Sequence, residues 1–142
     1  MTDFLTLHGK TNKAVRSLAE EGMRRHGLHL GQNLLLAVLW EEDGRTPGQI
    51  AAAVEVTTPA VVKMANRMVS SGLIERRPDG HDNRLVRLWL TDRGRALQKP
   101  VEDERRLLEA RLTADLTAEE RRILLTALAK VYRAASEGHD QN

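Results

Sequence analysis

The sequence has no cysteine, few aromatic residues and no long apolar run. Without cysteine it has no disulfide framework, no thiolate metal site and no thiol redox sensor. No stretch approaches the roughly 18 apolar residues of a membrane helix, and no signal-peptide pattern is present, so we expect a soluble, cytoplasmic protein with no membrane partner. Aromatic residues are only 3% of the 142 residues, so the core must use Leu, Val, Ala and Met. The length predicts one domain.

Basic residues are unevenly distributed, although the net charge is only +2. Residues 54–95 hold eight Lys or Arg against five Asp or Glu, residues 1–53 hold six of each, and residues 99–142 hold eight against nine. The excess positive charge therefore falls in the middle of the chain, as expected of a segment that contacts nucleic acid. Charge alone would also fit an ordinary arginine-rich surface.

Residues 46–72 have the pattern of two helices joined by a tight turn. Thr46 is a good N-cap, Pro47 suits the first helical position, and Gln49 completes a capping box. A second helix is expected to start near Thr57 or Thr58 and to end at a left-handed Gly72.

The helical period divides this second helix into two faces. Its inward positions are Val61, Met64, Ala65 and Met68. Its outward positions are Thr58, Val62, Lys63, Asn66, Arg67 and Ser70. An exposed face that carries positive charge and amide, on the second of two such helices, is how a helix-turn-helix reads a major groove.

A β-hairpin is expected directly after these helices. Residues 73–77 and 84–90 alternate as strands, and Pro78-Asp79-Gly80 is strong turn chemistry. The hairpin carries four arginines, Arg76, Arg77, Arg84 and Arg87, a cluster suited to phosphates or a minor groove. A hairpin after a recognition helix is a wing, so the predicted fold is mainly α with a small β-hairpin wing.

The run GLIERR, followed by Asp82-Asn83-Arg84 and by Leu90-Thr91 with Gly94, resembles the MarR (multiple antibiotic resistance regulator) family of winged-helix repressors. The resemblance extends over nearly the whole chain. It implies a winged helix-turn-helix flanked by N- and C-terminal dimerisation helices, within a single domain of residues 1–142. On this reading residues 30–91 form the DNA-reading lobe, and residues 1–29 and 92–142 form the dimerisation helices.

Two residues depart from the family pattern. Glu55 stands in the turn where many members have Gly, and a left-handed conformation there costs a non-glycine residue about 1 kcal/mol. Val62 replaces a common Ser or Thr on the outward face, which removes a hydroxyl and offers methyl groups to a thymine methyl. The family's usual base contacts therefore cannot simply be transferred.

Helices are expected on both sides of the central segment. Their predicted ranges are about 3–26, 30–42, 92–112 and from 117 onward. The second is nearly apolar on all sides from Leu34 to Trp40 and is expected to be buried. Pro100 should kink the third, since proline deletes a backbone donor. The terminal helices have more apolar surface than a thin lobe covers, so they predict a homodimer, with an intramolecular bundle as the alternative.

A polar stripe of His8, Asn12 and Arg16 follows the first helix. It is either an ordinary solvated face or the lining of an anionic-ligand pocket, because MarR-like proteins often bind aromatic acids beside this helix. Trp40 would supply an apolar wall for a small aromatic acid effector. His26 and His29 lack a third ligand, so no metal or other cofactor is expected.

We therefore predict a ligand-responsive repressor that binds double-stranded DNA as a homodimer on a pseudo-palindromic operator. The residues expected to read or flank bases in the major groove are Thr58, Lys63, Asn66 and Arg67. For Thr58 a phosphate contact is an equal alternative. Arg84 is expected in the minor groove, with Asp82 holding either Arg84 or the wing in place. Phosphate contacts are expected from Thr46, Thr57, Arg76 and Arg77. No catalytic motif is present, so an enzyme is not expected. The alternative is a winged-helix scaffold that binds protein without reading DNA.

Overall fold

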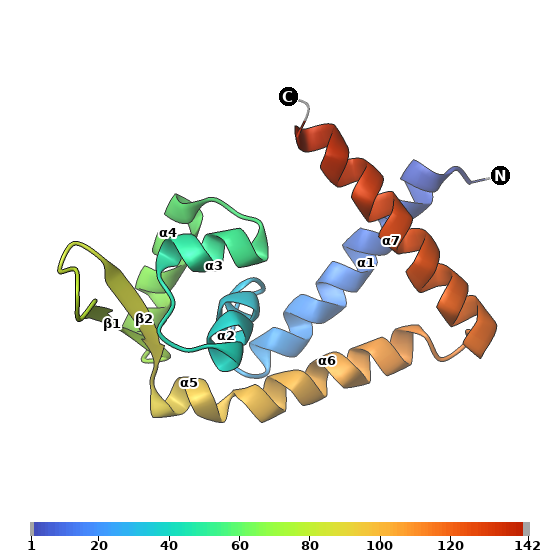
Figure 1. Ribbon diagram of the computed structural model, residues 1–142. Helices are drawn as coiled ribbons and strands as arrows, with labels where there is room; N and C mark the ends of the chain where they lie inside the picture. Colours follow the sequence, from blue (N-terminus) through green and yellow to red (C-terminus); the bar gives the residue numbers. More distant parts are fainter. Residues whose placement is uncertain (1, 141–142) are drawn as a thin grey trace. The chain divides into compact units, whose positions relative to one another are not determined.

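The computed structural model describes residues 2–140, and the chain divides into two compact units, residues 1–106 and 107–142. The helices and strands follow in the order α1 (Phe4–Arg24), α2 (Gln32–Glu41), α3 (Pro47–Val54), α4 (Thr58–Ser70), β1 (Ile74–Pro78), β2 (Val86–Leu90), α5 (Asp92–Ala96), α6 (Gln98–Leu112) and α7 (Ala118–Asp140). The mainly helical fold with one antiparallel hairpin confirms the predicted fold class (Figure 1).

The caps of α3 and α4 are the ones that the sequence predicts. The Thr46 hydroxyl accepts from the backbone N–H of Gln49 at 3.2 Å, and the Gln49 side chain accepts from the N–H of Thr46 at 2.9 Å. Thr57 caps α4 in the same way. At the far end Gly72 has φ +79°, and the N–H of Leu73 reaches back to the carbonyl of Met68 at 3.0 Å. These local bonds fix both ends of the helix pair.

Glu55 adopts the left-handed conformation, with φ 58° and ψ 44°, at the end of α3. The following N–H, of Val56, bonds the carbonyl of Ala51 at 3.1 Å, so the turn keeps the geometry that glycine usually provides. The neighbouring Ile50 and Val61 are fully buried. Burial of these side chains outweighs the backbone cost of about 1 kcal/mol.

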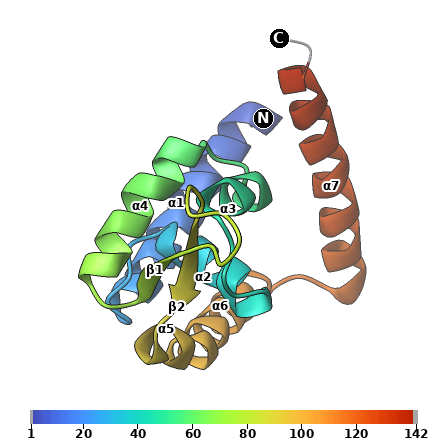
Figure 2. The same ribbon diagram turned by 60° about the vertical axis from the view of Figure 1, so that its left-hand side comes forward.

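The wing pairs β1 with β2 in antiparallel register, with Ile74 opposite Leu90 and Arg76 opposite Leu88. β2 begins at Val86, two residues later than predicted, because residues 82–85 close a turn in which the N–H of Leu85 bonds the carbonyl of Asp82. Arg45, just before α3, forms a bridge with Leu88. β1 lies beside α4 in both views (Figures 1 and 2), so the wing packs against α4 as well as against the loop before α3.

The core of the first unit lies among α2, α3, α4 and the wing. Its fully buried side chains are Leu28, Leu35, Leu36, Leu39, Ile50, Val61, Met68, Leu73, Ile74, Leu88 and Val101. The expectation that α2 is buried on all sides is wrong in part, because Leu34 is 43% exposed and Ala37 is also exposed. One side of α2 therefore faces outward.

The helix predicted over residues 92–112 is interrupted at Leu97, so it becomes α5 and α6. Pro100 has no N–H to bond the carbonyl of Ala96, four residues earlier, and that carbonyl lies at the break. Gly94 in α5 is close-packed, since a Cβ there would lie 2.2 Å from the carbonyl oxygen of Leu73. The Thr91 hydroxyl donates to the carbonyl of Gly72 at 2.6 Å and accepts from the N–H of Gly94. The Leu-Thr…Gly pattern thus joins the wing to α5.

In the second unit, α7 begins with the expected capping box between Thr117 and Glu120. Its apolar side chains are exposed. They are Ile123, Leu124, Leu125, Leu128, Val131 and Tyr132. No helix in the described part of the chain is long and apolar enough to cross a membrane.

Candidate nucleic-acid interface

The outward face of α4 carries the predicted residues, and all of them are exposed. Within the described residues, neither Lys63 nor Arg67 has an ion-pair or hydrogen-bond partner for its side chain. Unpaired cations can bind phosphate or base oxygens without first breaking another contact. The apolar face, with Val61, Ala65 and Met68, is buried as predicted.

Asn66 on α4 is joined to the wing. Arg76 of β1 donates a hydrogen bond from Nη2 to the Oδ1 atom of Asn66. The two residues are ten positions apart, and the sequence predicts separate roles for them, a base contact for Asn66 and a phosphate contact for Arg76. The structure brings them together, because the arginine of β1 is hydrogen-bonded to the asparagine of α4.

The three threonines of the site lie at helix N-termini. Thr46 and Thr57 use a hydroxyl lone pair to cap α3 and α4, and each retains its hydroxyl proton as a donor. Thr58 is the first residue of α4 and is exposed. Helix N-termini also offer free backbone N–H groups to anions, so the N-terminus of each of the two helices suits phosphate.

At the wing tip Asp82 holds Arg84, as the sequence suggested. The guanidinium donates from Nε to Asp82 Oδ1 at 3.1 Å and from Nη2 to Oδ2 at 3.3 Å. These bonds hold the pKa of the Asp82 carboxyl below its usual value, chiefly because Arg84 favours the charged form. Arg84 remains 91% exposed, so its outer edge is open to a groove.

Arg87 differs from the other wing arginines. Its Nε donates to Asp79 Oδ1 at 2.6 Å and its Nη1 to the carbonyl of Gly44 at 2.9 Å. The expectation that Arg87 belongs to the exposed basic cluster is therefore corrected: it braces the wing against the loop before α3. Asp79, whose pKa Arg87 lowers, also accepts the backbone N–H groups of His81 and Asp82. Sequence reasoning saw Asp79 only as a turn residue.

Arg77 lies between a carboxylate and an aromatic ring. Its Nε donates to Glu75 Oε1 at 2.7 Å, and its guanidinium carbon lies 5.3 Å from the ring centroid of Trp89. The cation–π contact holds the planar group while leaving it partly exposed. Arg77 is thus positioned rather than freely mobile.

The polar stripe on α1 (His8, Asn12 and Arg16) is exposed, and the structure does not bring Trp40 to it. His8 stacks on Phe4, and Arg16 pairs with Glu20 at 3.8 Å. Trp40 is turned toward α5, where its indole N–H donates to the carbonyl of Gly94 at 2.9 Å. Within the described part of the chain, Trp40 makes no hydrogen bond or ring contact with the stripe. A polar hollow of about 220 Å³ lies further along α1, lined by Glu20, Arg24, His29 and Leu30.

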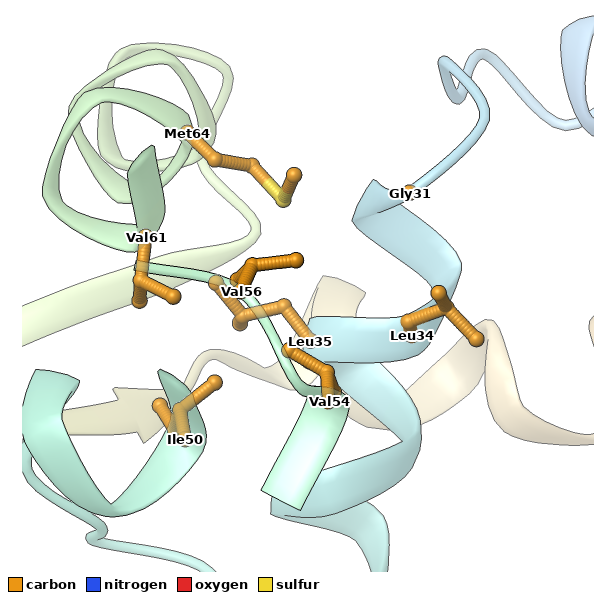
Figure 3. A pocket seen from close by; sticks show the side chains of 8 residues that line it. All are labelled: Gly31, Leu34, Leu35, Ile50, Val54, Val56, Val61 and Met64. Carbon is orange, nitrogen blue, oxygen red and sulfur yellow. The ribbon is translucent and has the colours of Figure 1, made fainter. Parts of the chain in front are cut away.

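An apolar hollow lies between α2 and the helix pair (Figure 3). Its lining residues are Gly31, Leu34, Leu35, Ile50, Val54, Val56, Val61 and Met64. The volume is about 60 Å³, well below the roughly 150 Å³ of an engineered cavity that holds benzene. It is therefore too small for an aromatic effector.

Glu104 ties the end of α1 to α6, a contact that sequence reasoning missed. Arg25 donates from Nε to Oε1 and from Nη2 to Oε2, both at 3.1 Å, and His26 Nε2 lies 3.2 Å from Oε1. The pKa of Glu104 is lowered, chiefly by the hydrogen bonds from Arg25. The only signal in the sequence was an acid that interrupts the apolar line of its helix.

Comparison with known proteins gives a consistent result. Residues 26–85 match a family model described as "MarR family". The chain is 33% identical over 122 residues to the HTH-type transcriptional repressor MdtR of Bacillus subtilis strain 168, covering 86% of this chain and 79% of MdtR. It is 32% identical over 119 residues to the HTH-type transcriptional regulator TtmR of Methylorubrum extorquens strain PA1, covering 84% of this chain. Here the match spans only 58% of TtmR.

The fold is also that of solved structures. The crystal structure of the S. aureus MepR–DNA complex superposes with a TM-score of 0.86, covering 94% of this chain and 99% of MepR. At 23% sequence identity this similarity concerns the fold. It supports the predicted winged helix-turn-helix with flanking helices.

Proposed function

This chain belongs to the MarR family, and we propose that it is a sequence-specific, DNA-binding transcriptional regulator. It acts as a repressor and not as an enzyme, in the cytoplasm, where the chromosome lies. The observation that carries this proposal is the exposed face of α4, with unpaired Lys63 and Arg67, beside a wing whose Arg84 is held outward by Asp82. A cationic helix flanked by an arginine-tipped hairpin suits adjacent major and minor grooves.

The contacts divide by chemistry. Lys63, Asn66 and Arg67 face the bases of the major groove, with Thr58 at its edge, and Arg84 enters the minor groove. The phosphate contacts come from Thr46, Thr57, Arg76 and Arg77. The threonines donate at helix N-termini, where the helix dipole also attracts an anion.

The active species is a homodimer built through residues 1–29 and 92–142. Its support is the exposed apolar surface on α1, where Phe4, Leu5 and Leu7 lie, and along α7. A two-fold dimer places two copies of α4 in successive major grooves, about 34 Å apart, on a pseudo-palindromic operator.

A small aromatic acid releases the protein from DNA in this proposal. The stripe of His8, Asn12 and Arg16 continues at the same spacing to Glu20 and Arg24, which line the polar hollow. A basic side chain there can hold a carboxylate. Trp40 is left out because it is turned toward α5. Loss of DNA release on titration with benzoate in Arg16→Ala or Arg24→Ala is the expected result, and release unchanged in both variants would place the site elsewhere.

Selection of binding sites from random duplexes tests the proposed function. We expect an enriched pseudo-palindrome bound by a dimer, with affinity falling about a hundredfold between roughly 50 and 200 mM salt if Arg76 and Arg77 of both protomers contact phosphates. Lys63→Ala or Arg67→Ala should relax base preference by about 1–3 kcal/mol, whereas Arg84→Ala should weaken binding to many sequences. Weak binding to every duplex even at low salt would favour a protein-binding scaffold instead.

A further inference from the structure

Val62 is an apolar side chain on the polar face of α4. It is 41% exposed, and its neighbours one turn away are Thr58 and Asn66. In B-DNA the major-groove edges of the four bases consist of donors and acceptors, apart from one apolar group, the C5-methyl of thymine. An aliphatic side chain on the reading face therefore has one natural complement.

The hydrogen bond from Arg76 fixes the orientation of the Asn66 amide. Arginine has donors and no acceptor, so the Asn66 atom that receives Arg76 must be its amide oxygen. The amide NH₂ then points away from Arg76. Asparagine usually reads adenine through both its oxygen and its nitrogen. Arg76 takes one of the two lone pairs of the oxygen and places a cationic group beside it, whereas both donors of the NH₂ have no partner in this bond. Asn66 therefore favours acceptors on a base edge.

Thymine is the base that carries a methyl group beside an acceptor, since C5-methyl and O4 are neighbours on its major-groove edge. Val62 and Asn66 are four residues apart on one helix face. We propose that these two side chains together read one thymine in each half-site: Val62 contacts the methyl, and Asn66 donates to O4. Arg76 is the positioning residue that keeps Asn66 a donor. This proposal rests on the proposed DNA-binding function.

Removal of one methyl group at a time tests Val62. In the selected duplex each thymine is replaced by uracil, which keeps pairing and O4. At one thymine per half-site we expect about a fourfold loss of affinity, and about fifteenfold when both half-sites are changed. With cytosine at that position, 5-methylcytosine should bind about fourfold better than cytosine.

Both methyl effects should vanish in Val62→Ala. They should persist in Val86→Ala, which shortens an exposed valine of the wing. Thymine-to-uracil changes without effect at every position, or effects that survive in Val62→Ala, would overturn the role of Val62. A selection that enriches no sequence would instead overturn the proposed function.

The role of Asn66 is tested by comparing thymine with 5-methylcytosine, which keeps the methyl but presents an amino donor in place of O4. We expect the wild type to prefer thymine about tenfold, and Asn66→Ala to lose most of this preference. Arg76→Ala frees the amide oxygen and should reduce the preference at this position alone. Arg76→Lys, which restores a donor, should recover it. An Arg76→Ala variant that loses affinity equally on all duplexes, with its thymine preference intact, would show a phosphate contact only and overturn the positioning role.

Discussion

Gly94 is the position where a single added carbon is most disruptive. In Gly94→Ala the new Cβ would lie 2.2 Å from the carbonyl oxygen of Leu73 and 3.2 Å from a methyl of Leu90. Both neighbours are buried, and one of them is backbone, so the start of α5 must move away from the wing. Overpacking of this kind costs about 1–3 kcal/mol.

The displacement also strains three hydrogen bonds. Thr91 bonds the carbonyls of Leu73 and Gly72, and Trp40 bonds the carbonyl of Gly94. Each contributes about 1 kcal/mol, whereas alanine's better helix propensity returns up to about 1 kcal/mol. The net expectation is a loss of about 3 kcal/mol in the free energy of unfolding, or roughly 10 °C in the midpoint of thermal unfolding.

Urea unfolding followed by circular dichroism measures this loss. The protein concentration is held fixed, since the stability of the proposed dimer would depend on it. The matched control is Gly48→Ala in α3, outside the proposed dimer interface, where an added Cβ meets no atom within 4 Å. It should stabilise the protein by about 0.5–1 kcal/mol. The two variants should therefore differ in sign. A Gly94→Ala variant within about 0.5 kcal/mol of wild type would refute the close contact between α5 and the wing.

Three further changes test other contacts. Leu128→Asp should yield monomers or aggregates in sedimentation, because it places a charge on the proposed apolar interface. The control Lys130→Asp, two residues further along α7, should leave the dimer intact. An unchanged dimer in both variants would show that the interface lies elsewhere. Asp79→Asn should weaken operator binding, because it weakens the contact that holds Arg87 and the wing tip. The control Asp92→Asn, at a fully exposed carboxylate, should not weaken binding. Equal affinity for both variants would show that operator binding does not depend on the contact between Asp79 and Arg87. Arg25 lowers the pKa of Glu104, so the ionised Glu104 stabilises the fold above the ordinary pKa of 4.5, and this stabilisation is lost as the pH falls through the lowered pKa. The difference in unfolding free energy between the wild type and Glu104→Gln should therefore shrink over this pH range. A difference that does not change with pH would contradict the role of Glu104.

Local chemistry explains most of what the sequence predicted correctly. Thr46, Thr57 and Thr117 each cap the N-terminus of a helix, because the threonine hydroxyl accepts a hydrogen bond from the free backbone N–H three residues later. This contact does not depend on the rest of the chain. The same applies to Gly72 and to the inward spacing along α4. These features depend on neighbours within one or two turns, and such neighbours can be read from spacing.

Contacts between distant residues were not predictable in this way. Glu104 meets Arg25 across 79 positions, and Trp40 meets Gly94 across 54. The position of Glu104 in the sequence does not distinguish a carboxylate that binds two basic side chains from one that faces solvent. For the same reason the sequence placed Trp40 in an effector pocket and Arg87 in a basic cluster, where only the packed lobe decides otherwise.

The carboxylates of the central segment divide its arginines by task. Glu75 and Asp79 each hold an arginine within the wing, and Asp82 holds Arg84 at its tip. Such pairs are nearly neutral at long range, so they add little to the attraction of DNA from a distance. Four cations of residues 54–95 have no acidic partner among the described residues: Lys63 and Arg67 on α4, Arg76 beside them, and Arg93 in α5, which bonds the carbonyl of Ser71. These four therefore supply most of the net field of this part of the chain. The attraction of a polyanion is thus expected to be strongest near α4. The paired arginines of the wing are held in fixed orientations by their carboxylates. Under the proposed DNA-binding function, this arrangement would draw the duplex toward α4 first, and the shape of the groove would determine how the wing engages.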